Sequence, residues 1–422
     1  MRDLRSLLQL ALNLLLGLSL ILLLHACQPP SATLSATPTP ASPESNAAPP
    51  TRESAALPPE TQAIVASATP PNGLFNPPRG DERLVVISDL NTVYGSTDYD
   101  PEIDKAMALL PFWQPDMVIC GGDMVAGQDP TLSNEQLKAM WAAFDDHVAA
   151  PLRNAGLPFG FTIGNHDASS AQSVSGQFLF ERERQVASAY WQDPEHDPGV
   201  EFVDRNEFPF YYTFKRNDIF FLVWDGSSFK IPQEKLAWVE QALESPAAQS
   251  AKIKILLGHL PLYAIAAGRD NAGNVMANAD ELWAMLERHT VHTYISGHHH
   301  AYYPGHKGKL QFLQMGLLGS GPRPYIGSSL PPHKAITVMD INFDSPELTT
   351  YTTYDIQTLE LIEFAQLPPF IDGHNGRVFR RDVEPEALGG ASLRKKLPTP
   401  SNDWATAPLR LARTAAKPDR LP

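Results

Sequence analysis

Cysteine is scarce in this chain of 422 residues, in which only Cys27 and Cys120 occur. A fold held together by several disulfide bonds, as in many small secreted domains, is therefore excluded. Cys120 ends an apolar run that begins at Met117, where a buried and unreactive thiol is expected. Stability must come from a hydrophobic core instead, and the chain is long enough to form a large one.

Basic residues are in the minority. Lys and Arg number 33 against 47 Asp and Glu, which gives a formal net charge of −14. Binding to nucleic acid requires a basic surface that neutralises phosphates. The composition therefore disfavours nucleic acid as a partner, and no nucleic-acid-binding surface is expected.

The N-terminus carries a long apolar run. It extends from Leu7 to Leu24, after Arg2 and Arg5, and Ala26-Cys27 follows it. A basic segment, an apolar segment and a small-residue cleavage site are the parts of a secretory signal peptide. The end of the run resembles a bacterial lipobox, in which Cys27 becomes the lipidated first residue, although His25 departs from the usual small or aliphatic residue.

The alternative to a lipoprotein is an uncleaved membrane anchor, because the apolar run is almost long enough to span a bilayer. Both alternatives tether the chain to a membrane and place its remainder outside the cytoplasm, in the periplasm or at the cell surface. If Cys27 is lipidated, Cys120 has no partner for an internal disulfide.

Composition divides the chain into four parts. Residues 1–27 are predicted to be the signal peptide. Residues 28–80 are rich in Pro, Ala, Ser and Thr, and a segment of this kind is typical of a flexible linker. Residues 81–366 are predicted to form one folded domain. Residues 367–422 are Pro-rich and Arg-rich without periodicity, so an extended tail is expected there.

The predicted domain alternates strands and helices before it ends in a run of strands. Helices are expected after Asp100-Pro101, after the capping box Ser133–Gln136, after Pro232, and from Asp280 to Arg288. Such an order suggests an α/β fold with two packed sheets flanked by helices. The expected strands are 84–88, 117–120, 159–163, 211–214, 219–223, 253–257, 293–295, 310–313, 336–341 and 348–354.

Five polar clusters follow five of these β-like segments. Carboxylate, amide and imidazole side chains are the ligands that a pair of divalent metals requires, with one carboxylate able to bridge the two ions. Taken alone, each cluster has an ordinary structural explanation, such as a helix cap, a turn or a solvated histidine. Their shared position at strand ends indicates a binuclear metal site; the clusters are Ser88–Asn91, Gly121–Asp123, Gly164–Asp167, Gly258–Pro261 and Gly297–His300.

This set of motifs resembles the calcineurin-like metallophosphoesterase superfamily, which includes purple acid phosphatases and phosphodiesterases, over roughly residues 84–355. The resemblance implies a four-layer α/β/β/α sandwich. It also implies that Asp89, Asp123 and His300 bind the first metal, and that Asp123 bridges to the second. Asn165, His259 and His298 would complete the second site, while His166 would be the general acid and His299 would turn away.

Two motifs depart from the usual pattern. The family usually has Asp-x-His in its first motif, whereas this chain has Asp89-Leu90-Asn91. Asn91 is a poorer ligand than imidazole for transition metals, so the first site is expected to be weaker, with Asn91 binding the metal or orienting a water molecule. Ala126 and Gly127 replace the Asp and Arg of Ser/Thr protein phosphatases, and the ligating Tyr of purple acid phosphatases is also missing.

The function implied by the resemblance is hydrolysis of small phosphoesters, either monoesters or diesters. Two divalent ions such as Mn, Fe or Zn would hold a hydroxide that attacks phosphorus. Tyr263, Arg269 and Arg323 follow the clusters in sequence and are candidates for substrate contacts. One alternative is a non-catalytic metal-binding or ligand-binding lipoprotein that retains the fold. The other is an interaction protein whose long linker and tail allow it to reach its partner.

Overall fold

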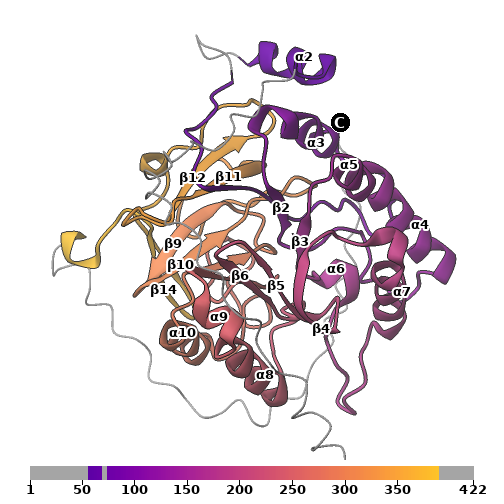
Figure 1. Cartoon of the computed structure of the whole chain (residues 1–422). Coiled ribbons are helices and arrows are strands. Elements are labelled where there is room, and N and C mark those ends of the chain that lie inside the picture. The colour runs from indigo at the N-terminus through magenta and orange to yellow at the C-terminus, as the bar shows by residue number, and fades with distance from the viewer. Residues whose placement is uncertain (1–55, 69–73, 389–422) are drawn as a thin grey trace, which may run out of the picture. The chain divides into compact units, whose positions relative to one another are not determined.

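The computed structural model describes residues 56–68 and 74–388 of the chain, and its strands form two sheets (Figure 1). In the five-stranded sheet, β1, β2 and β3 are parallel, while β11 and β12 add to the other side of β1 in antiparallel pairs. The order is β12 (Thr349–Asp355), β11 (Ala335–Ile341), β1 (Glu82–Ile87), β2 (Met117–Cys120) and β3 (Phe159–Phe161).

The second sheet has nine strands and a parallel centre. Strands β6, β7, β8 and β10 are parallel neighbours, and antiparallel strands extend the sheet on both sides. The order is β13 (Phe370–Gly373), β14 (Gly376–Arg380), β9 (Tyr303–Lys307), β10 (Leu310–Gln314), β8 (Thr293–Ser296), β7 (Ile253–Leu257), β6 (Ile219–Val223), β5 (Tyr211–Arg216) and β4 (Glu201–Glu207).

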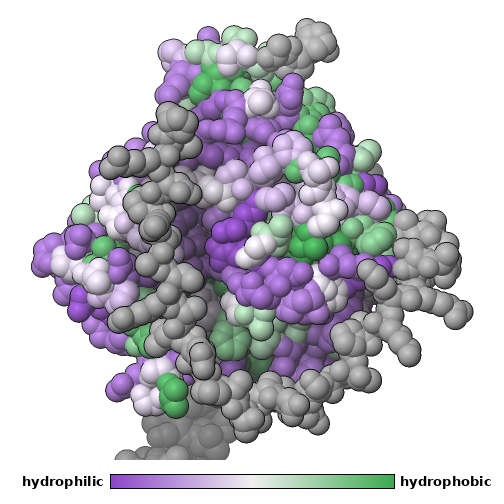
Figure 2. Space-filling model, turned by 180° about the vertical axis from the view of Figure 1, so that it is seen from behind, coloured by the Kyte–Doolittle hydropathy of each residue, from purple (hydrophilic) through white to green (hydrophobic). Residues whose placement is uncertain are grey.

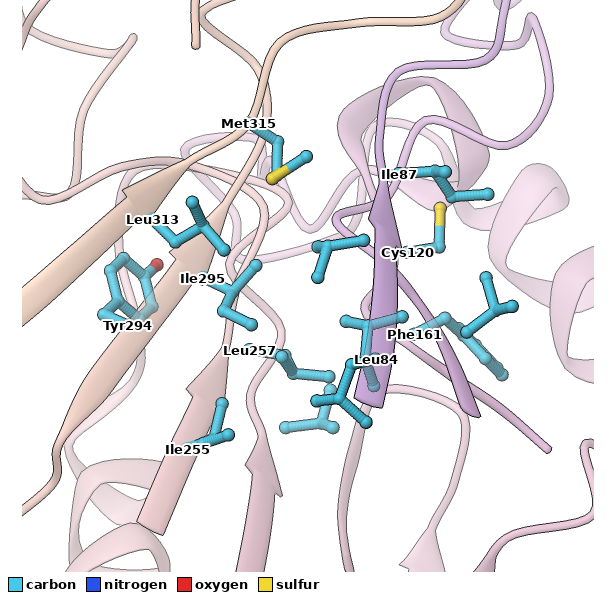
Figure 3. Close-up of a cluster of buried hydrophobic side chains, with 14 of the residues drawn as sticks. Leu84, Ile87, Cys120, Phe161, Ile255, Leu257, Tyr294, Ile295, Leu313 and Met315 are labelled. Atoms are coloured by element: carbon cyan, nitrogen blue, oxygen red, sulfur yellow. The ribbon is translucent and has the colours of Figure 1, made fainter. Parts of the chain in front are cut away.

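The hydrophobic core lies between the two sheets (Figure 3). Leu84 of β1, Leu257 of β7 and Ile295 of β8 belong to this cluster and are fully buried, whereas Ile87 lies beside Cys120 on the other side of β1. Cys120 is also completely buried at the end of β2, as the sequence predicts, and burial raises the pKa of its thiol well above the ordinary value. Apolar contacts between the sheets therefore hold them together.

Helices flank both sheets (Figure 1). Beside the five-stranded sheet, Trp191 of α7 stacks on Phe161 of β3 with ring centroids 4.0 Å apart, and on its other side it contacts Trp141 of α4. The helices on this side are α3 (Pro101–Trp113), α4 (Asn134–Phe144), a π-helical turn η1 (Asp145–Ala149), α5 (Ala150–Asn154) and α7 (Glu181–Gln192). Beside the nine-stranded sheet are α8 (Gln233–Leu243), α9 (Pro246–Ser250) and α10 (Ala279–Arg288).

The expected α/β fold with sheets flanked by helices is confirmed. All ten predicted strands exist, and helices begin after Pro232 and within one residue of Asp280, as expected. The capping box of α4 is formed by Ser133 and Gln136. The sequence pattern does not predict α7. It also does not predict the short elements α6 (Asn165–Ala168), η2 (Pro194–His196), η3 (Phe364–Gln366) and η4 (Pro385–Leu388).

The predicted boundary of the flexible linker at residue 80 is wrong. Helix α2 (Pro59–Ser67) forms within the predicted linker, and the Thr61 hydroxyl donates a 2.7 Å hydrogen bond to the Ala108 carbonyl of α3. Leu74 is buried, and the carbonyl of Phe75 accepts a hydrogen bond from the Tyr354 hydroxyl. The high proline content concealed these contacts, because composition does not report what a short segment packs against.

The predicted extended tail also begins too early. Strands β13 and β14 form an antiparallel hairpin, and β14 pairs with β9, so the nine-stranded sheet continues to Arg380. Ile371 and Val378 of this hairpin are buried. Each strand of the hairpin has only one buried apolar residue, so the sequence shows no alternating hydrophobic pattern there.

The predicted signal peptide, Cys27 and the last part of the tail lie outside the described residues. Among the helices that the structure does describe, none combines the length and hydrophobicity needed to cross a membrane. Figure 2 shows one face of the molecule, on which hydrophilic residues dominate and apolar residues lie in small separate groups.

A buried ion pair attaches the segment before β1 to the sheet. The Nε atom of Arg83 lies 2.8 Å from Asp340 Oδ1 of β11, and the same guanidinium donates to the carbonyls of Pro77 and Trp113. Asp340 also accepts a hydrogen bond from the amide of Gly80. Removal of the carboxylate would leave a buried guanidinium without a counter-charge, which is strongly destabilising.

We therefore expect Asp340→Ala to lower the free energy of unfolding by about 3–5 kcal/mol. The matched control is Asp382→Ala, which removes an exposed ion pair with Arg380 and should cost less than about 1 kcal/mol. Urea unfolding followed by circular dichroism measures both values. Equal effects from the two substitutions would contradict this account of the ion pair.

Candidate metal centre

The loops after five strands converge at one edge of the two sheets. Asp89 and Asp123 follow β1 and β2, and Asn165 begins α6 shortly after β3. From the other sheet, His259 follows β7, and the Gly297–His300 loop follows β8. Both sheets therefore contribute side chains to the same place, as expected where carboxyl ends of parallel strands meet.

Four of these residues have a strained backbone. Their φ angles are positive, at 51° for Asp89, 55° for Asp123, 65° for His298 and 52° for His300. A left-handed conformation costs a residue other than glycine roughly 1–3 kcal/mol and persists only where the surroundings enforce it. Such strain is concentrated at functional sites, and here it directs the side chains of four neighbouring residues.

Glycines allow the strand ends to approach one another. A Cβ atom on Gly122, whose φ is 95°, would lie 2.8 Å from both the Gly164 nitrogen and His259 Nδ1. A Cβ atom on Gly297 would overlap the side chains of Ser88 and Asp89. A side chain at either position would therefore separate the residues that form the site.

The converging side chains form two groups that share Asp123. Asp123, His259 and His298 offer one group of donor atoms, and Asp89, Asp123 and His300 offer the other. Within each group the donor atoms lie within 4.8 Å of one another, and four of the five residues are almost fully buried, while His300 is 9% exposed. This is the arrangement required for a carboxylate that bridges two ions.

The group of Asp123, His259 and His298 also includes an amide oxygen. Asn165 Oδ1 lies 2.9 Å from His259 Nε2 and 2.8 Å from His298 Nδ1, while its Nδ2 donates to Gln128 Oε1. Asp123 Oδ2 lies 3.2 Å from the same His259 nitrogen. Four electron-pair donors therefore face one another in a buried space, and a positive charge among them is required to offset their repulsion.

Hydrogen bonds on the far side of two of the rings fix which nitrogen is free. His259 Nδ1 donates to the carbonyl of Gly121 at 2.7 Å, and His300 Nδ1 donates to the carbonyl of Gly321 at 3.0 Å. His298 Nε2 lies 3.1 Å from Asn274 Oδ1, which can only accept, and 3.1 Å from Arg269 Nη1, which can only donate. When neutral, His259 and His300 thus present Nε2, unprotonated, to the donor groups, which is how metal-binding histidines are oriented.

In the protein without ions, a proton supplies part of the missing positive charge. Burial alone lowers the pKa of His259, but the neighbouring Asp123 carboxylate outweighs it and raises the pKa to about 9. Burial raises the pKa of Asp123, whereas His259 and His166 hold it well below its usual range. Burial keeps the pKa of His298 low, so that ring is neutral. The donor set therefore fits divalent cations, which would replace this proton.

His166 is attached to the shared carboxylate by its backbone. Its amide nitrogen donates to Asp123 Oδ1 at 2.8 Å, and its ring Nδ1 donates to the carbonyl of Gly127 at 3.0 Å. The ring is only partly buried and lies 5.1 Å from that of Tyr94, centroid to centroid. The Nε2 atom has no hydrogen-bond partner among the described residues and remains free for a ligand.

Asn91 lies at the same edge of the sheet. Its backbone nitrogen donates to the carbonyl of Asp123, and its side chain is 6% exposed. The side-chain amide of Asn91 makes no hydrogen bond to another residue that the structure describes, so its oxygen is available to an ion or a water molecule. His299, by contrast, uses both ring nitrogens on the backbone of Ile265 and Asn274 and turns away, as predicted.

The three predicted substrate contacts have different positions. Tyr263 is fully buried, and its hydroxyl donates to Asp280 and accepts from Lys307, so the prediction of a substrate contact is wrong for this residue. Aromatic residues beside a ligand motif often pack into the core, and this one does. Arg269 lies 3.1 Å from His298 Nε2, and the amide of Arg323 donates to the carbonyl of His300, so both arginines border the site.

Two residues that support the site were missed in the sequence. Asp167 accepts hydrogen bonds from the amides of Met124, Val125 and Gly164, and so holds two of the converging loops together. Asn274 orients His298 from a loop that contains no strand-end motif. The proximity of Asp167 to His166 was the only signal for the first, and no local signal marks the second.

Comparison with protein families gives a match over residues 82–302 to the model described as calcineurin-like phosphoesterase. The chain belongs to the calcineurin-like phosphoesterase family. The match covers all the converging motifs up to His300. A comparison with curated protein sequences finds no match.

Solved structures with similar folds include a purple acid phosphatase, PPD1, from yellow lupin (Lupinus luteus) seeds. It is 14% identical, with a TM-score of 0.47, and the alignment covers 69% of this chain and 54% of that one. GAP50, described as the anchor in the inner membrane complex of Plasmodium, is 15% identical with a TM-score of 0.42 and coverage of 67% and 87%. The chain thus spans about half of the length of the lupin protein.

The shared position of Asp123 leads to a prediction about metal content. Asp123→Asn should remove most of the bound divalent metal, because this carboxylate belongs to both donor groups. Asp225→Asn is the control: it changes a carboxylate that is equally buried and follows β6, but that pairs with Arg184 outside both groups. Elemental analysis of the purified variants measures the metal, and an equal loss from both would contradict the assignment.

Proposed function

We propose that this chain is a metal-dependent phosphoric ester hydrolase with a binuclear centre. The observation that carries the proposal is the pair of buried donor groups that share Asp123, within a chain that belongs to a phosphoesterase family. Asp89, Asp123 and His300 would hold one ion, and Asp123, Asn165, His259 and His298 would hold the other. Asn91 would complete the first site, directly or through a water molecule.

When bound, two divalent ions would polarise the phosphoryl group and make a nucleophilic water available at neutral pH. The residues of this chain perform the remaining tasks. The backbone strain at the strand ends keeps the ligands oriented before substrate binds. The carbonyls of Gly121 and Gly321 keep His259 and His300 in the tautomer that presents a free nitrogen, and Asn274 contacts the ring of His298.

His166 would donate the proton that the leaving oxygen requires. Its Nδ1 is engaged with the carbonyl of Gly127, so Nε2 is the atom that carries the transferable proton. The hydrogen bond from the His166 amide to Asp123 ties the position of this ring to the ligand shared by both ions. General acid catalysis matters most when the leaving group is a poor one, such as an alkoxide.

The substrates we propose are small phosphoesters rather than phosphoproteins, with diesters slightly favoured among the small esters. Ala126 and Gly127 replace the residues typical of protein phosphatases, and both are nearly buried. The test is turnover of p-nitrophenyl phosphate and bis(p-nitrophenyl) phosphate by the purified chain with Mn²⁺ added. Metal binding without turnover of either ester would support the alternative, a non-catalytic metal-binding protein, for which the replacement of His by Asn91 is the supporting observation.

A second variant tests the role of His166. His166→Ala should reduce hydrolysis of alkyl phosphoesters by roughly 10²–10⁴-fold, the usual contribution of a general acid. Hydrolysis of p-nitrophenyl esters should fall much less, because nitrophenolate leaves without a proton. Metal content should be unchanged, since the hydrogen bond to Asp123 comes from the backbone. An equal loss on both ester classes would remove His166 from this role.

We also propose that the protein is a lipoprotein tethered outside the cytoplasm. The support is the order of a basic start, an apolar run and Ala26-Cys27 in the sequence. Mass spectrometry of the membrane-extracted protein should find a diacylglyceryl group on an N-terminal Cys27. An intact N-terminus at Met1 would contradict lipidation and support an uncleaved anchor.

A further inference from the structure

Two arginines without an acidic partner lie beside the metal centre. Within residues 56–68 and 74–388, no carboxylate lies within 4.0 Å of the guanidinium of Arg269 or of Arg323. Among the described residues, the side-chain polar groups within hydrogen-bond distance of the Arg269 guanidinium belong to Asn274 and His298. In a chain with a net charge of −14, two adjacent cations without counter-charges require an explanation.

Backbone pairing holds the two arginines side by side. The amide of Ala267 donates to the carbonyl of Pro324 at 2.9 Å, and the amide of Ile326 donates to the carbonyl of Ile265 at 2.9 Å. Gly268 has a φ of 80°, and a Cβ atom there would lie 3.2 Å from Nη1 of Arg323. The guanidinium of Arg323 therefore lies over the residue next to Arg269.

The proximity of the two cations is unfavourable in the protein alone. Burial lowers the pKa of Arg323, and the charge of Arg269 lowers it further. In addition, the Nε atom of Arg323 is buried without a hydrogen-bond partner. A buried donor that lacks an acceptor costs about 1–3 kcal/mol, which adds to the unfavourable proximity of the two cations.

Each arginine is connected to a different donor group. Arg269 Nη1 lies 3.1 Å from Nε2 of His298, on the side of the ring opposite the donor atom Nδ1. Arg323 is tied through its amide to the carbonyl of His300, which belongs to the other group. The two arginines thus border both donor groups from outside. The imidazole rings separate the arginines from the donor atoms.

We propose that Arg269 and Arg323 bind a second anionic group of the substrate, a carboxylate or a further phosphate, while the reacting phosphoester occupies the metal centre. Planar guanidinium groups match both kinds of anion through paired charge-assisted hydrogen bonds. An anion between them would neutralise the neighbouring cations and accept hydrogen bonds from their guanidinium groups. This inference rests on the proposed phosphoesterase function and adds the chemical class of its substrate.

The test compares three esters on one three-carbon chain. Propyl phosphate has no second anion, 3-phosphonooxypropanoate ends in a carboxylate, and propane-1,3-diyl bisphosphate ends in a second phosphate. For the Mn²⁺-loaded wild-type chain, kcat/KM should be at least tenfold higher for one or both of the esters with a second anion. The ester with the higher value identifies which anion is preferred.

Arg323→Gln should lower that preference, expressed as the ratio of kcat/KM values, by about tenfold, the scale of one charge-assisted hydrogen bond. Arg323→Lys should lose part of it, because the charge remains without the planar fork. Arg205→Gln, on the edge strand β4, should leave the ratio unchanged. Circular dichroism and metal content identify any variant that is misfolded, in which case Arg269→Gln provides the same comparison.

Two results would overturn the inference. If the wild type hydrolyses all three esters equally well, or if Arg323→Gln leaves the ratio unchanged, the arginine pair does not bind substrate and the phosphoesterase function still stands. If no ester is hydrolysed, the proposed function fails, and calorimetry decides the binding question separately. Phosphonoacetate should then bind the wild type more tightly than methylphosphonate, and an equal affinity of the two would refute the anion site.

Discussion

The site depends on one electrostatic requirement, namely that lone pairs of Asp123, Asn165, His259 and His298 converge in a buried space. The carboxylate and amide oxygens bring no proton to the centre, and the neutral ring of His259 brings none because its Nδ1 donates outward to the Gly121 carbonyl. A cation is the simplest group that satisfies all four at once. The other donor group, Asp89, Asp123 and His300, also requires a positive charge among its donor atoms. The surrounding structure therefore has to hold these electron-pair donors together against their mutual repulsion.

Two stable sheets make this possible. Each strained residue costs roughly 1–3 kcal/mol, so the four positive φ angles represent a cost comparable to much of the stability of an ordinary domain. Contacts that converge on the loops offset this cost: Asp167 accepts three backbone amides, and the amide of His298 donates to both carboxylate oxygens of Asp89. The buried apolar layer between the sheets fixes the strand ends from which the loops begin (Figure 3).

The sequence was informative where chemistry and local pattern coincide. Continuous apolar runs predict buried parallel strands, and polar residues at their ends predict converging ligands such as Asp89 and His259. Asn274 could not be predicted, because it reaches His298 through a loop whose path depends on tertiary packing. The β13–β14 hairpin and α2 were hidden by proline-rich composition, and Tyr263 was misplaced because sequence proximity to a ligand does not give side-chain direction.

Charge is distributed unevenly between the chain and its site. Two carboxylates, Asp89 and Asp123, face two donor groups, so divalent ions in both would leave an excess of positive charge, to which Arg269 and Arg323 add. The chain as a whole is acidic, with a net charge of −14. Long-range attraction therefore does not favour anionic substrates, and screening by salt limits it further. Recognition of an anion must then come from short contacts at the centre itself, where burial strengthens each charge interaction. This distribution selects small anions that can enter the site over large acidic partners that would meet the negative surface first.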